Sequence, residues 1–566
     1  MRILPALVFL CACCWAMAAT AAPPASLDAA LARLQGGDAA GAARDLESLT
    51  RSGLRSAEAF GALGNAYQQL HEHRRAIEAY QSALAVDADA PRIFYALGSS
   101  YAASGDAEQA FAWLARARAS RRIDMTRATQ DKNLDSLRSD ARFARLLPTP
   151  ADFDDPFVEP VRVLREWRGE AANDQFGWIA RNLGDVDGDG VADVVVSAPT
   201  HGADSSNAGR IYVYSTGRDA LLWTADGRAG EQLGTGVEAA GDTDGDGIPD
   251  VVASGPGLGG VARIYSGRDG HVLHEFRAPR PDETFGNHAA GAGDVDGDGH
   301  ADIIVGSPGK DGEHKSPGHA YVYSGRTGAL LLALHGERNG DQFGSTVAGF
   351  SDGRQQWLVV GAPLAGPAHH GRAYVYAGPA HRLQFTIDAD ATGNALGLMF
   401  VSLPGDMDGD GVSEVFASDW SNAAHGFSTG RVYVYSGRTG RLLHSFTGEH
   451  PGDGFGTSAS VAGDIDGDGR ADLVVGAWQY GGAAVSGGRA YLYSGRDGRL
   501  LASYTCRTPG DTFGFDAAGL GVVQPDGTTG LLITSGWSGV NGFHSGRVFV
   551  LASGFAAPAA ARQPGG

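Results

Sequence analysis

Two hydrophobic periods divide the chain. From residue 27 to about residue 120, small and apolar residues recur every 34 positions, which predicts stacked pairs of short helices. From residue 158 to residue 554, short apolar runs alternate with glycine-rich turns at a period of 52 to 59 residues, which predicts strands. The residues that carry the first period are Phe60, Leu63, Gly64, Tyr67, Ala76 and Ala83, which return as Phe94, Leu97, Gly98, Tyr101, Ala110 and Ala117.

The helical period resembles the tetratricopeptide repeat, in which small residues let paired helices approach closely. A third, weaker copy is predicted because Gly37-Asp38 matches Gly105-Asp106 at twice the period. The stretch over residues 134–147 reads as an amphipathic helix that caps the repeats. The resemblance implies a groove that can hold a partner peptide.

Seven units follow one another in the second part of the chain. Within a unit, a continuous apolar run such as residues 301–306 precedes an alternating run such as residues 430–435, which ends in a hairpin turn and one more strand. Four strands in each of seven units predict an all-β seven-bladed β-propeller with four-stranded antiparallel blades. The unit markers, each a large apolar residue followed by glycine, are Phe176-Gly177, Leu233-Gly234, Phe285-Gly286, Phe343-Gly344, Leu396-Gly397, Phe455-Gly456 and Phe513-Gly514.

The way the ring closes can also be predicted. Trp167 lies nine positions before the first unit marker, and large residues precede most later markers at the same distance. The strand that ends at Trp167 therefore comes before the first blade, whereas the last unit ends at Leu551 with no such strand after it. We expect the amino-terminal strand to complete the seventh blade and to cover the strand edges that an open ring would expose.

A second marker follows the first by 21 residues in five units, for example as Ser197-Ala198-Pro199 and Gly306-Ser307-Pro308. The two markers together resemble the FG-GAP repeats of integrin α-chain propellers. The resemblance implies that calcium has a structural role in the blades. It also implies that a protein or glycan ligand binds on the face opposite to the calcium loops.

Five units share one acidic loop of nine residues, which begins at Asp185 in the first unit. Carboxylates at positions 1, 3, 5 and 9 converge only if the chain turns sharply, and glycines at positions 4 and 6 permit such turns. Position 7 offers its backbone carbonyl. The expected metal ligands are Asp185, Asp187, Asp189, Val191 and Asp193; Asp242, Asp244, Asp246, Ile248 and Asp250; Asp294, Asp296, Asp298, His300 and Asp302; Asp406, Asp408, Asp410, Val412 and Glu414; and Asp464, Asp466, Asp468, Arg470 and Asp472.

The oxygen ligands of these loops suit Ca²⁺, whereas zinc or copper would favour His or Cys. An EF-hand is excluded because its twelfth position, an acidic ligand, is valine or alanine in every copy. Units four and seven have lost the loop: residues 351–354 form a shortened turn, and residues 524–527 keep one carboxylate. We therefore expect up to five structural calcium ions.

The formal net charge of −20 arises largely from these loops, because five loops with four carboxylates each contain 20 acidic side chains. Five calcium ions would bring the net charge to −10. A charge this negative argues against nucleic acid as a partner. Two carboxylates about 4 Å apart repel by roughly 4 kcal/mol at an effective dielectric constant of 20, so calcium would hold together loops that otherwise splay.

The first 21 residues have the pattern of a cleavable secretory signal, with Arg2, an apolar run and then small residues. A lipoprotein cleavage site at residues 10–13 is the alternative. Removal of the signal leaves Cys506 as the only cysteine, so no intramolecular disulfide can form. We expect an exported protein that is periplasmic, extracellular or at the cell surface, with no transmembrane segment after signal removal.

The expected domain order follows from these patterns. The segments in chain order are a signal peptide over residues 1–21, helical repeats with their capping helix over 22–147, a proline-rich acidic linker over 148–157, the propeller over 158–554 and a disordered tail over 555–566.

The sequence predicts binding rather than catalysis. It contains no HExxH, GxSxG or Walker motif, and no Rossmann fingerprint that is followed by a helix. Some FG-GAP propellers are joined to catalytic domains, as in the glycosylphosphatidylinositol-specific phospholipase D group, but here helical repeats without a His/Asp cluster take that place. Two alternatives stay open: a propeller enzyme, lyase or hydrolase, that acts on polysaccharide, and a periplasmic envelope assembly scaffold.

The candidate ligand face has an uneven composition. Only the loops that follow the second marker in units five to seven contain aromatic residues, which are enriched where proteins bind peptides and sugars. The alternative is that the three tryptophans among them wedge between blades. The residues are Trp420, Phe427, Trp478, Tyr480, Trp537 and Phe543.

Overall fold

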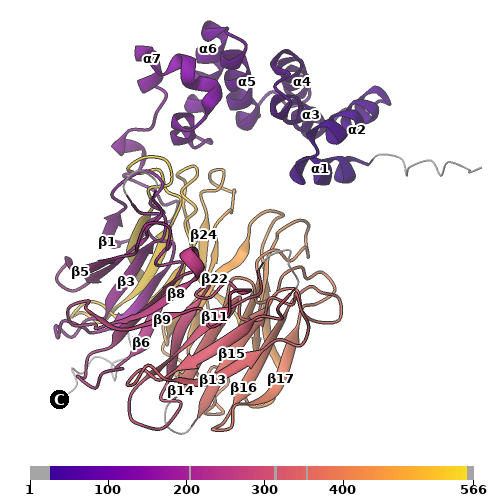
Figure 1. Cartoon of the computed structure of the whole chain (residues 1–566). Coiled ribbons are helices and arrows are strands. Elements are labelled where there is room, and N and C mark those ends of the chain that lie inside the picture. The colour runs from indigo at the N-terminus through magenta and orange to yellow at the C-terminus, as the bar shows by residue number, and fades with distance from the viewer. Residues whose placement is uncertain (1–25, 203–205, 311–314, 352–354, 557–566) are drawn as a thin grey trace, which may run out of the picture. The chain divides into compact units, whose positions relative to one another are not determined.

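A computed structural model describes residues 26–202, 206–310, 315–351 and 355–556 (Figure 1). The chain forms two compact units, the first comprising the chain up to Ala117 with Lys132–Phe143, the second comprising Arg118–Asp131 with the chain from Ala144 onward. The predicted signal over residues 1–21 lies outside the described residues, as does most of the predicted tail.

The first unit consists of antiparallel helix pairs. Its six main helices are α1 (Leu27–Gln35), α2 (Ala39–Arg51), α3 (Ala57–Gln69), α4 (His73–Val86), α5 (Pro91–Ala103) and α6 (Ala107–Ala119). The repeat glycines act as predicted: a Cβ built on Gly64 of α3 would lie 2.4 Å from the Tyr80 ring of α4. A Cβ on Gly98 of α5 would lie 2.6 Å from Leu114 of α6, so these two helix pairs each depend on a residue without a side chain at the crossing.

The predicted capping helix over residues 134–147 is not continuous. The chain instead forms a 3₁₀-helix over Lys132–Leu137 and a single turn, α7, over Ala141–Ala144. Asp140 separates the two because its Oδ1 accepts a hydrogen bond from the backbone N–H of Arg142 at 2.8 Å, which favours a new helix start. Two more 3₁₀-helices, Met125–Thr129 and Pro150–Asp152, belong to the second unit.

The second unit contains seven four-stranded antiparallel sheets, which confirms the predicted seven-bladed propeller (Figure 1). Blades one to three are β2 (Ala180–Gly184), β3 (Asp193–Ala198), β4 (Arg210–Ser215) and β5 (Ala220–Asp226); β6 (Gly236–Gly241), β7 (Asp250–Gly255), β8 (Val261–Tyr265) and β9 (Val272–Arg277); and β10 (Ala289–Gly293), β11 (Asp302–Ser307), β12 (His319–Tyr323) and β13 (Leu330–His335). A 3₁₀-turn, Gly257–Gly259, lies between β7 and β8.

Blades four to six are β14 (Thr346–Ser351), β15 (Gln356–Ala362), β16 (Arg372–Ala377) and β17 (Arg382–Asp388); β18 (Val401–Ser402), β19 (Val415–Asp419), β20 (Arg431–Tyr435) and β21 (Leu442–Thr447); and β22 (Phe455–Gly463), β23 (Asp472–Ala477), β24 (Arg489–Tyr493) and β25 (Leu500–Thr505). Blade seven contains β26 (Ala517–Val522), β27 (Thr528–Ser535), β28 (Arg547–Ala556) and β1 (Val163–Arg168).

The ring closes as predicted, because β1 pairs antiparallel with β28 and places Trp167 opposite Val548. The Trp167 ring is buried and stacks on Tyr214 of blade one, with 4.6 Å between ring centroids. The amino-terminal segment reaches further than the sequence suggested, since Phe157 is 4% exposed and bridges to Cys506 in blade six. Cys506 itself is a buried free thiol, as expected.

The unit markers form the centre of the blade cores, because the large residue of every marker is at most 1% exposed. The glycine that follows is required by space and by backbone conformation. Gly344, for example, has a φ of +90°, and a Cβ there would lie 2.0 Å from the carbonyl oxygen of His319. The markers are therefore packing positions where one chain segment crosses another at close range.

Candidate metal sites and the opposite face

The five acidic loops join the first strand to the second strand in blades one, two, three, five and six. Their glycines at positions 4 and 6 have the left-handed conformation that the sequence predicted; Gly188 and Gly190, for example, have φ values of +77° and +83°. Each loop gathers three or four carboxylates whose nearest oxygens lie within 4.8 Å of one another. The groups are Asp185, Asp187 and Asp193; Asp242, Asp244 and Asp246; Asp294, Asp296 and Asp302; Asp406, Asp408, Asp410 and Glu414; and Asp464, Asp466 and Asp472.

The carboxylate at position 1 shapes each loop through hydrogen bonds from backbone amides. Asp185 Oδ1 accepts from the N–H of Gly188 at 2.7 Å, and its Oδ2 accepts from the N–H of Gly190 at 2.8 Å. The other four loops repeat this pair of contacts. Because the same aspartate accepts from both ends of the turn, it bends the chain around the point where the carboxylates meet.

The carboxylate at position 9 is fully buried in every loop and ties the loop to the blade behind it. Asp302 Oδ2 accepts from the N–H of Val295 at 2.7 Å, and its Oδ1 accepts from the N–H of Gly325, in the hairpin between β12 and β13, at 3.0 Å. Burial raises the pKa of Asp193 and of Asp302 to about 6 and that of Glu414 to about 7. These groups therefore hold protons more readily than an exposed carboxylate does.

The donor set fits a hard divalent cation. Glu414 Oε1 is buried and accepts no hydrogen bond, so the blade-five loop contains an oxygen that still has ligand capacity, whereas Asp187 Oδ2 in blade one lies 3.1 Å from Arg218 Nη1. All groups of this kind among the described residues are built from aspartate and glutamate alone, with neither His nor Cys. Oxygen-only sites of this charge favour Ca²⁺ or Mg²⁺ over zinc or copper.

The clusters do not contain every predicted ligand. Position 5 lies outside the tight group in blades one, three and six, and position 9 lies outside it in blade two. The side chain at position 7, to which the sequence assigned no role, reaches the preceding loop in two blades. His300 Nδ1 lies 3.0 Å from the carbonyl oxygen of Thr243, and Arg470 Nη1 lies 3.6 Å from Asp406 Oδ2.

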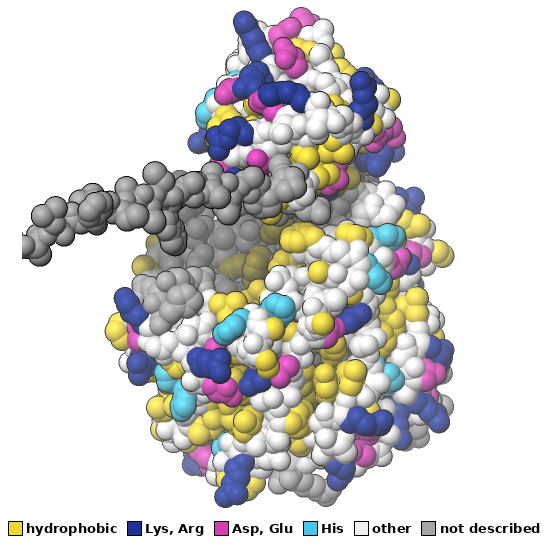
Figure 2. All heavy atoms as spheres, turned by 90° about the vertical axis from the view of Figure 1, so that its right-hand side faces the viewer, with side chains coloured by type: hydrophobic (Ala, Val, Ile, Leu, Met, Phe, Trp, Pro, Cys, Tyr) yellow, Lys and Arg dark blue, Asp and Glu magenta, His cyan; other side chains and the backbone are white. Residues whose placement is uncertain are grey.

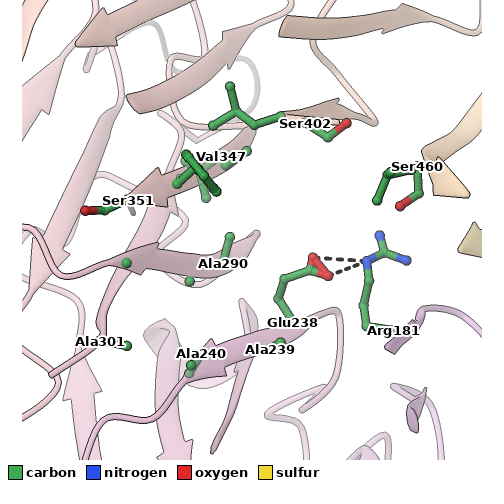
Figure 3. A pocket seen from close by; sticks show the side chains of 18 of the residues that line it. Arg181, Glu238, Ala239, Ala240, Ala290, Ala301, Val347, Ser351, Ser402 and Ser460 are labelled. Atoms are coloured by element: carbon green, nitrogen blue, oxygen red, sulfur yellow. Dashed lines mark hydrogen bonds and ion pairs between the residues drawn. The ribbon is translucent and has the colours of Figure 1, made fainter. Parts of the chain in front are cut away.

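A buried charge cluster in the centre of the ring is a feature that the sequence did not reveal. The innermost strands of the blades surround a cavity of about 650 Å³ (Figure 3). Arg181 on β2 points toward Glu238 on β6, and its Nε donates to Glu238 Oε2 at 3.0 Å. Arg181 also pairs with Asp516, which precedes β26. No motif marks this cluster, because its three members lie in three different units.

The predicted aromatic positions differ in their surroundings. They lie in the loops that follow the second strand of blades five to seven, at the end of that strand opposite to the position of the acidic loop. Trp478 and Trp537 lie in contact, with ring centroids 4.7 Å apart, and Phe515 of blade seven extends the cluster to Trp178 of blade one at 4.9 Å. The indole N–H groups of Trp478 and Trp537 have no hydrogen-bond partner within the described residues.

The remaining aromatic positions are more peripheral. Phe427 is 70% exposed, Trp420 is half-buried, and Phe543 stacks on His544 at 3.6 Å. Tyr480 is held in place because Arg489 Nη1 donates to its hydroxyl at 3.1 Å. The structure therefore places a continuous aromatic cluster over blades six, seven and one, with the exposed ring of Phe427 and the half-buried Trp420 in blade five.

A seven-bladed ring with acidic loops at one end of its inner strands defines an integrin-α-like propeller. The FG-GAP-like repeat family matches residues 242–305 and 406–475, and the FG-GAP repeat family matches residues 176–214. The tetratricopeptide repeat family matches residues 64–105. The chain therefore contains FG-GAP repeats within its propeller and a tetratricopeptide repeat within its amino-terminal helices.

Similar proteins include integrin alpha-PS5 of Drosophila melanogaster, 32% identical over 170 residues, which are 27% of this chain and 17% of that protein. Integrin alpha-V of Gallus gallus is 31% identical over 184 residues, 30% of this chain and 18% of that protein. Human phosphatidylinositol-glycan-specific phospholipase D is 26% identical over 397 residues, 58% of this chain and 46% of that protein. The chain thus spans less than a fifth of these integrins and less than half of the phospholipase.

Proposed function

We propose that this protein is a calcium-stabilised interaction module. The observation that supports the proposal best is the set of five carboxylate clusters, each shaped by backbone amides and each at the same place in its blade. The integrin α-like propeller supports a role in adhesion or in another binding interaction. The proposal also includes export of the protein, since extracellular calcium is abundant enough to fill sites of modest affinity.

In this proposal calcium neutralises charge that the fold has already concentrated. The carboxylates at positions 1, 3 and 9 hold the ion in most loops, with position 5 in blades two and five. The bound ion would add attraction between groups that otherwise repel one another. Because position 9 contacts both the loop and the hairpin behind it, a cation there would stabilise the whole blade end.

The experiment that tests calcium binding is a comparison of melting curves with 2 mM calcium and with excess EGTA. A ligand at 100 times its dissociation constant adds about 2.7 kcal/mol for each site that forms only in the folded state, so the melting temperature should rise clearly with calcium. The control variant is Asp526→Asn, in the blade-seven turn that keeps one carboxylate. Equal melting temperatures in calcium and EGTA would contradict the proposal.

We assign partner binding to the face opposite to the acidic loops. The exposed ring of Phe427 and the aromatic cluster of blades six, seven and one support this assignment, because aromatic residues stack on sugar rings and insert into peptide pockets. An array of glycans and proteins, probed with and without calcium, would identify the ligand. If the folded, calcium-loaded protein bound no glycan and no protein on the arrays, this assignment would be contradicted.

The helical unit offers a second surface in the proposal, a groove for a partner peptide. The family match over residues 64–105 supports it, since helical repeats of this type present concave surfaces. A pull-down that compares the full chain with a variant of exposed helix residues, such as Gln81→Ala, tests this role. Equal recovery of every partner would assign binding to the propeller.

A second candidate function is catalysis on a polysaccharide or a related substrate. The similarity to a phospholipase over 397 residues keeps it open. Among the described residues, however, every group of three or more carboxylate, His or Cys ligands lies in the five loops, so the helices show no separate metal centre. Turnover on a panel of polysaccharides would favour this candidate.

Among the helices that the structure describes, none combines the length and the apolar character needed to span a membrane.

A further inference from the structure

Every blade that has an acidic loop also has an arginine in a hairpin of the same blade. The hairpin between the third and fourth strands carries an arginine in all five blades that have a loop, at Arg218, Arg268, Arg326, Arg438 and Arg496. Blade four has lost the loop, and its hairpin reads Gly378-Pro379-Ala380-His381, without an arginine before β17 begins at Arg382. The acidic loop joins the first strand to the second, and the hairpin joins the third strand to the fourth. Because the strands are antiparallel, both connections lie at the same end of the blade. The correlation within one chain suggests that the arginine serves the loop.

In two blades the hairpin arginine contacts the carboxylate at position 5. Arg268 Nε and Nη2 both lie 2.9 Å from Asp246 Oδ2. Arg438 Nε donates to Asp410 Oδ2 at 2.8 Å, and its Nη2 donates to the backbone carbonyl of the same residue at 2.6 Å. The other carboxylate oxygen, Oδ1, accepts from the position-7 amide at 2.8 Å in both loops.

In two other blades an arginine contacts the carboxylate at position 3. Arg218 Nη1 lies 3.1 Å from Asp187 Oδ2, the buried oxygen that accepts no hydrogen bond. Arg499, three residues after the usual hairpin position, donates from Nη2 to Asp466 Oδ2 at 2.6 Å. In both cases the guanidinium belongs to the same blade as the loop, so the contact forms when the blade folds.

Blade three is the exception. Arg326 is exposed and forms no ion pair with any of the described residues, although it holds the same hairpin position. Its loop, which begins at Asp294, is instead contacted by neutral groups of blade four: Ser351 Oγ and Gln356 Nε2 both donate to the Asp294 carbonyl oxygen, at 3.0 and 3.2 Å. The chain therefore contains one loop without the arginine contact.

The charge of these arginines has two consequences. A guanidinium beside three or four carboxylates reduces their mutual repulsion, which favours the folded loop. The same positive charge opposes a divalent cation that approaches those carboxylates. The four arginine side chains are 54 to 59% exposed, so solvent screens each contact and each effect is small for a single loop.

We propose that Arg218, Arg268, Arg438 and Arg499 are built-in counter-charges that stabilise their loops without calcium and weaken calcium binding there. The inference rests on the proposed calcium binding. It follows that the loop of blade three, which lacks the contact, binds calcium most tightly. The arginines would then set the calcium concentration at which most of the propeller becomes loaded.

The test replaces all four arginines by glutamine in the full chain and measures calcium binding by titration calorimetry. Exposed ion pairs are weak, so the dissociation constant of the affected sites should fall by roughly two- to fivefold. The melting temperature in EGTA should fall, while that in saturating calcium should stay near the parent's. Arg326→Gln is the matched control and should change neither value. Replacement of the four by lysine should keep most of the parent's behaviour.

The outcomes separate the two proposals. A parent protein that binds no calcium overturns the proposed function itself. A parent that binds calcium, together with a glutamine variant of equal or weaker affinity, overturns the role of the arginines. If the fourfold variant does not fold, the pair Arg268→Gln and Arg438→Gln is measured in the same way, with the same expected direction.

Discussion

Arg547 and Asp511 form a fully buried ion pair where the last strand begins, with Arg547 Nε donating to Asp511 Oδ2 at 3.0 Å. Cys506 Sγ contacts the same carboxylate oxygen at 3.3 Å, and Arg547 Nη1 donates to the Phe153 carbonyl at 3.2 Å. The pair thus joins the amino-terminal segment to blades six and seven. A buried charge that loses its partner is strongly destabilising.

Asp511→Asn should lower the free energy of unfolding by up to about 3–5 kcal/mol, because it removes the closest partner of the buried Arg547 charge and leaves only Glu166, whose Oε1 lies 3.4 Å from Arg547 Nη1. Urea unfolding measures the change. The double variant Asp511→Leu and Arg547→Met should recover much of the loss, since neither charge remains. Asp497→Asn, at an exposed site, serves as the control. A single Asp511 variant as stable as the parent would show that the pair does not hold these segments.

Trp167→Ala should destabilise the propeller by about 3–5 kcal/mol, because its ring fills the junction of blades seven and one. Val163→Ala, on the same strand but 40% exposed, should cost much less. Chemical unfolding of both variants provides the comparison. If the two variants unfold at the same denaturant concentration as the parent, closure by β1 contributes little to stability.

The central cluster should make stability depend on pH. Burial raises the pKa of Glu238 to about 7, and Arg181, Asp516 and His288 face it. The folded state therefore binds more protons than the unfolded chain between about pH 4.5 and 7, and this contribution to stability is lost as pH rises through that window.

Glu238→Gln cannot titrate and should reduce the slope of the pH dependence over that range, while Asp193, Asp302 and Glu414, whose pKa values are also raised, keep contributing to it. Melting curves at pH 5 and pH 7.5 in EGTA, for the parent and the variant, test this. His288 has a pKa lowered to about 4 by burial, so it stays neutral across the window and does not add to the slope. An identical slope in parent and variant would assign the pH dependence to other groups.

Phe427→Ala with Phe543→Ala should weaken binding of the array-identified partner about tenfold or more, if these rings are contact points. The side chains are exposed or partly exposed, so the melting temperature should change little. Leu258→Ala is the control, because Leu258 is 65% exposed and follows the second strand of blade two, on the same face. If the double variant folds and binds the partner with the parent's affinity, these rings are not contact points. The alternative, that the three tryptophans pack between blades, would then hold.

The sequence was most informative where one residue type recurs at a fixed phase. The marker Phe343-Gly344 could be recognised because its packing requirement returns in all seven units, and the loop that begins at Asp185 because its turn requirement returns in five of them. The closing strand followed from the same phase, since Trp167 occupies a position that the last unit lacks.

Contacts between residues of different blades could not be predicted from recurrence at a fixed phase. Arg181, Glu238 and Asp516 come from three blades and share no spacing, so only the folded ring brings them together. The capping helix was predicted as one piece because its apolar spacing is helical, but Asp140 starts a new turn. Basic and acidic side chains lie interspersed over the face in Figure 2, and composition does not show which of them pair.

The pairing of β1 with β28 also constrains the order of events during synthesis. Val163 contacts Leu551, so a strand made early must remain without its neighbour until almost the whole chain has been produced. Pairing over so long a separation is entropically costly and slow. A nascent chain that ends before Arg547 leaves β1 and β27 with open edges, ready to pair with another molecule. Truncated forms of this protein should therefore aggregate rather than accumulate as smaller propellers.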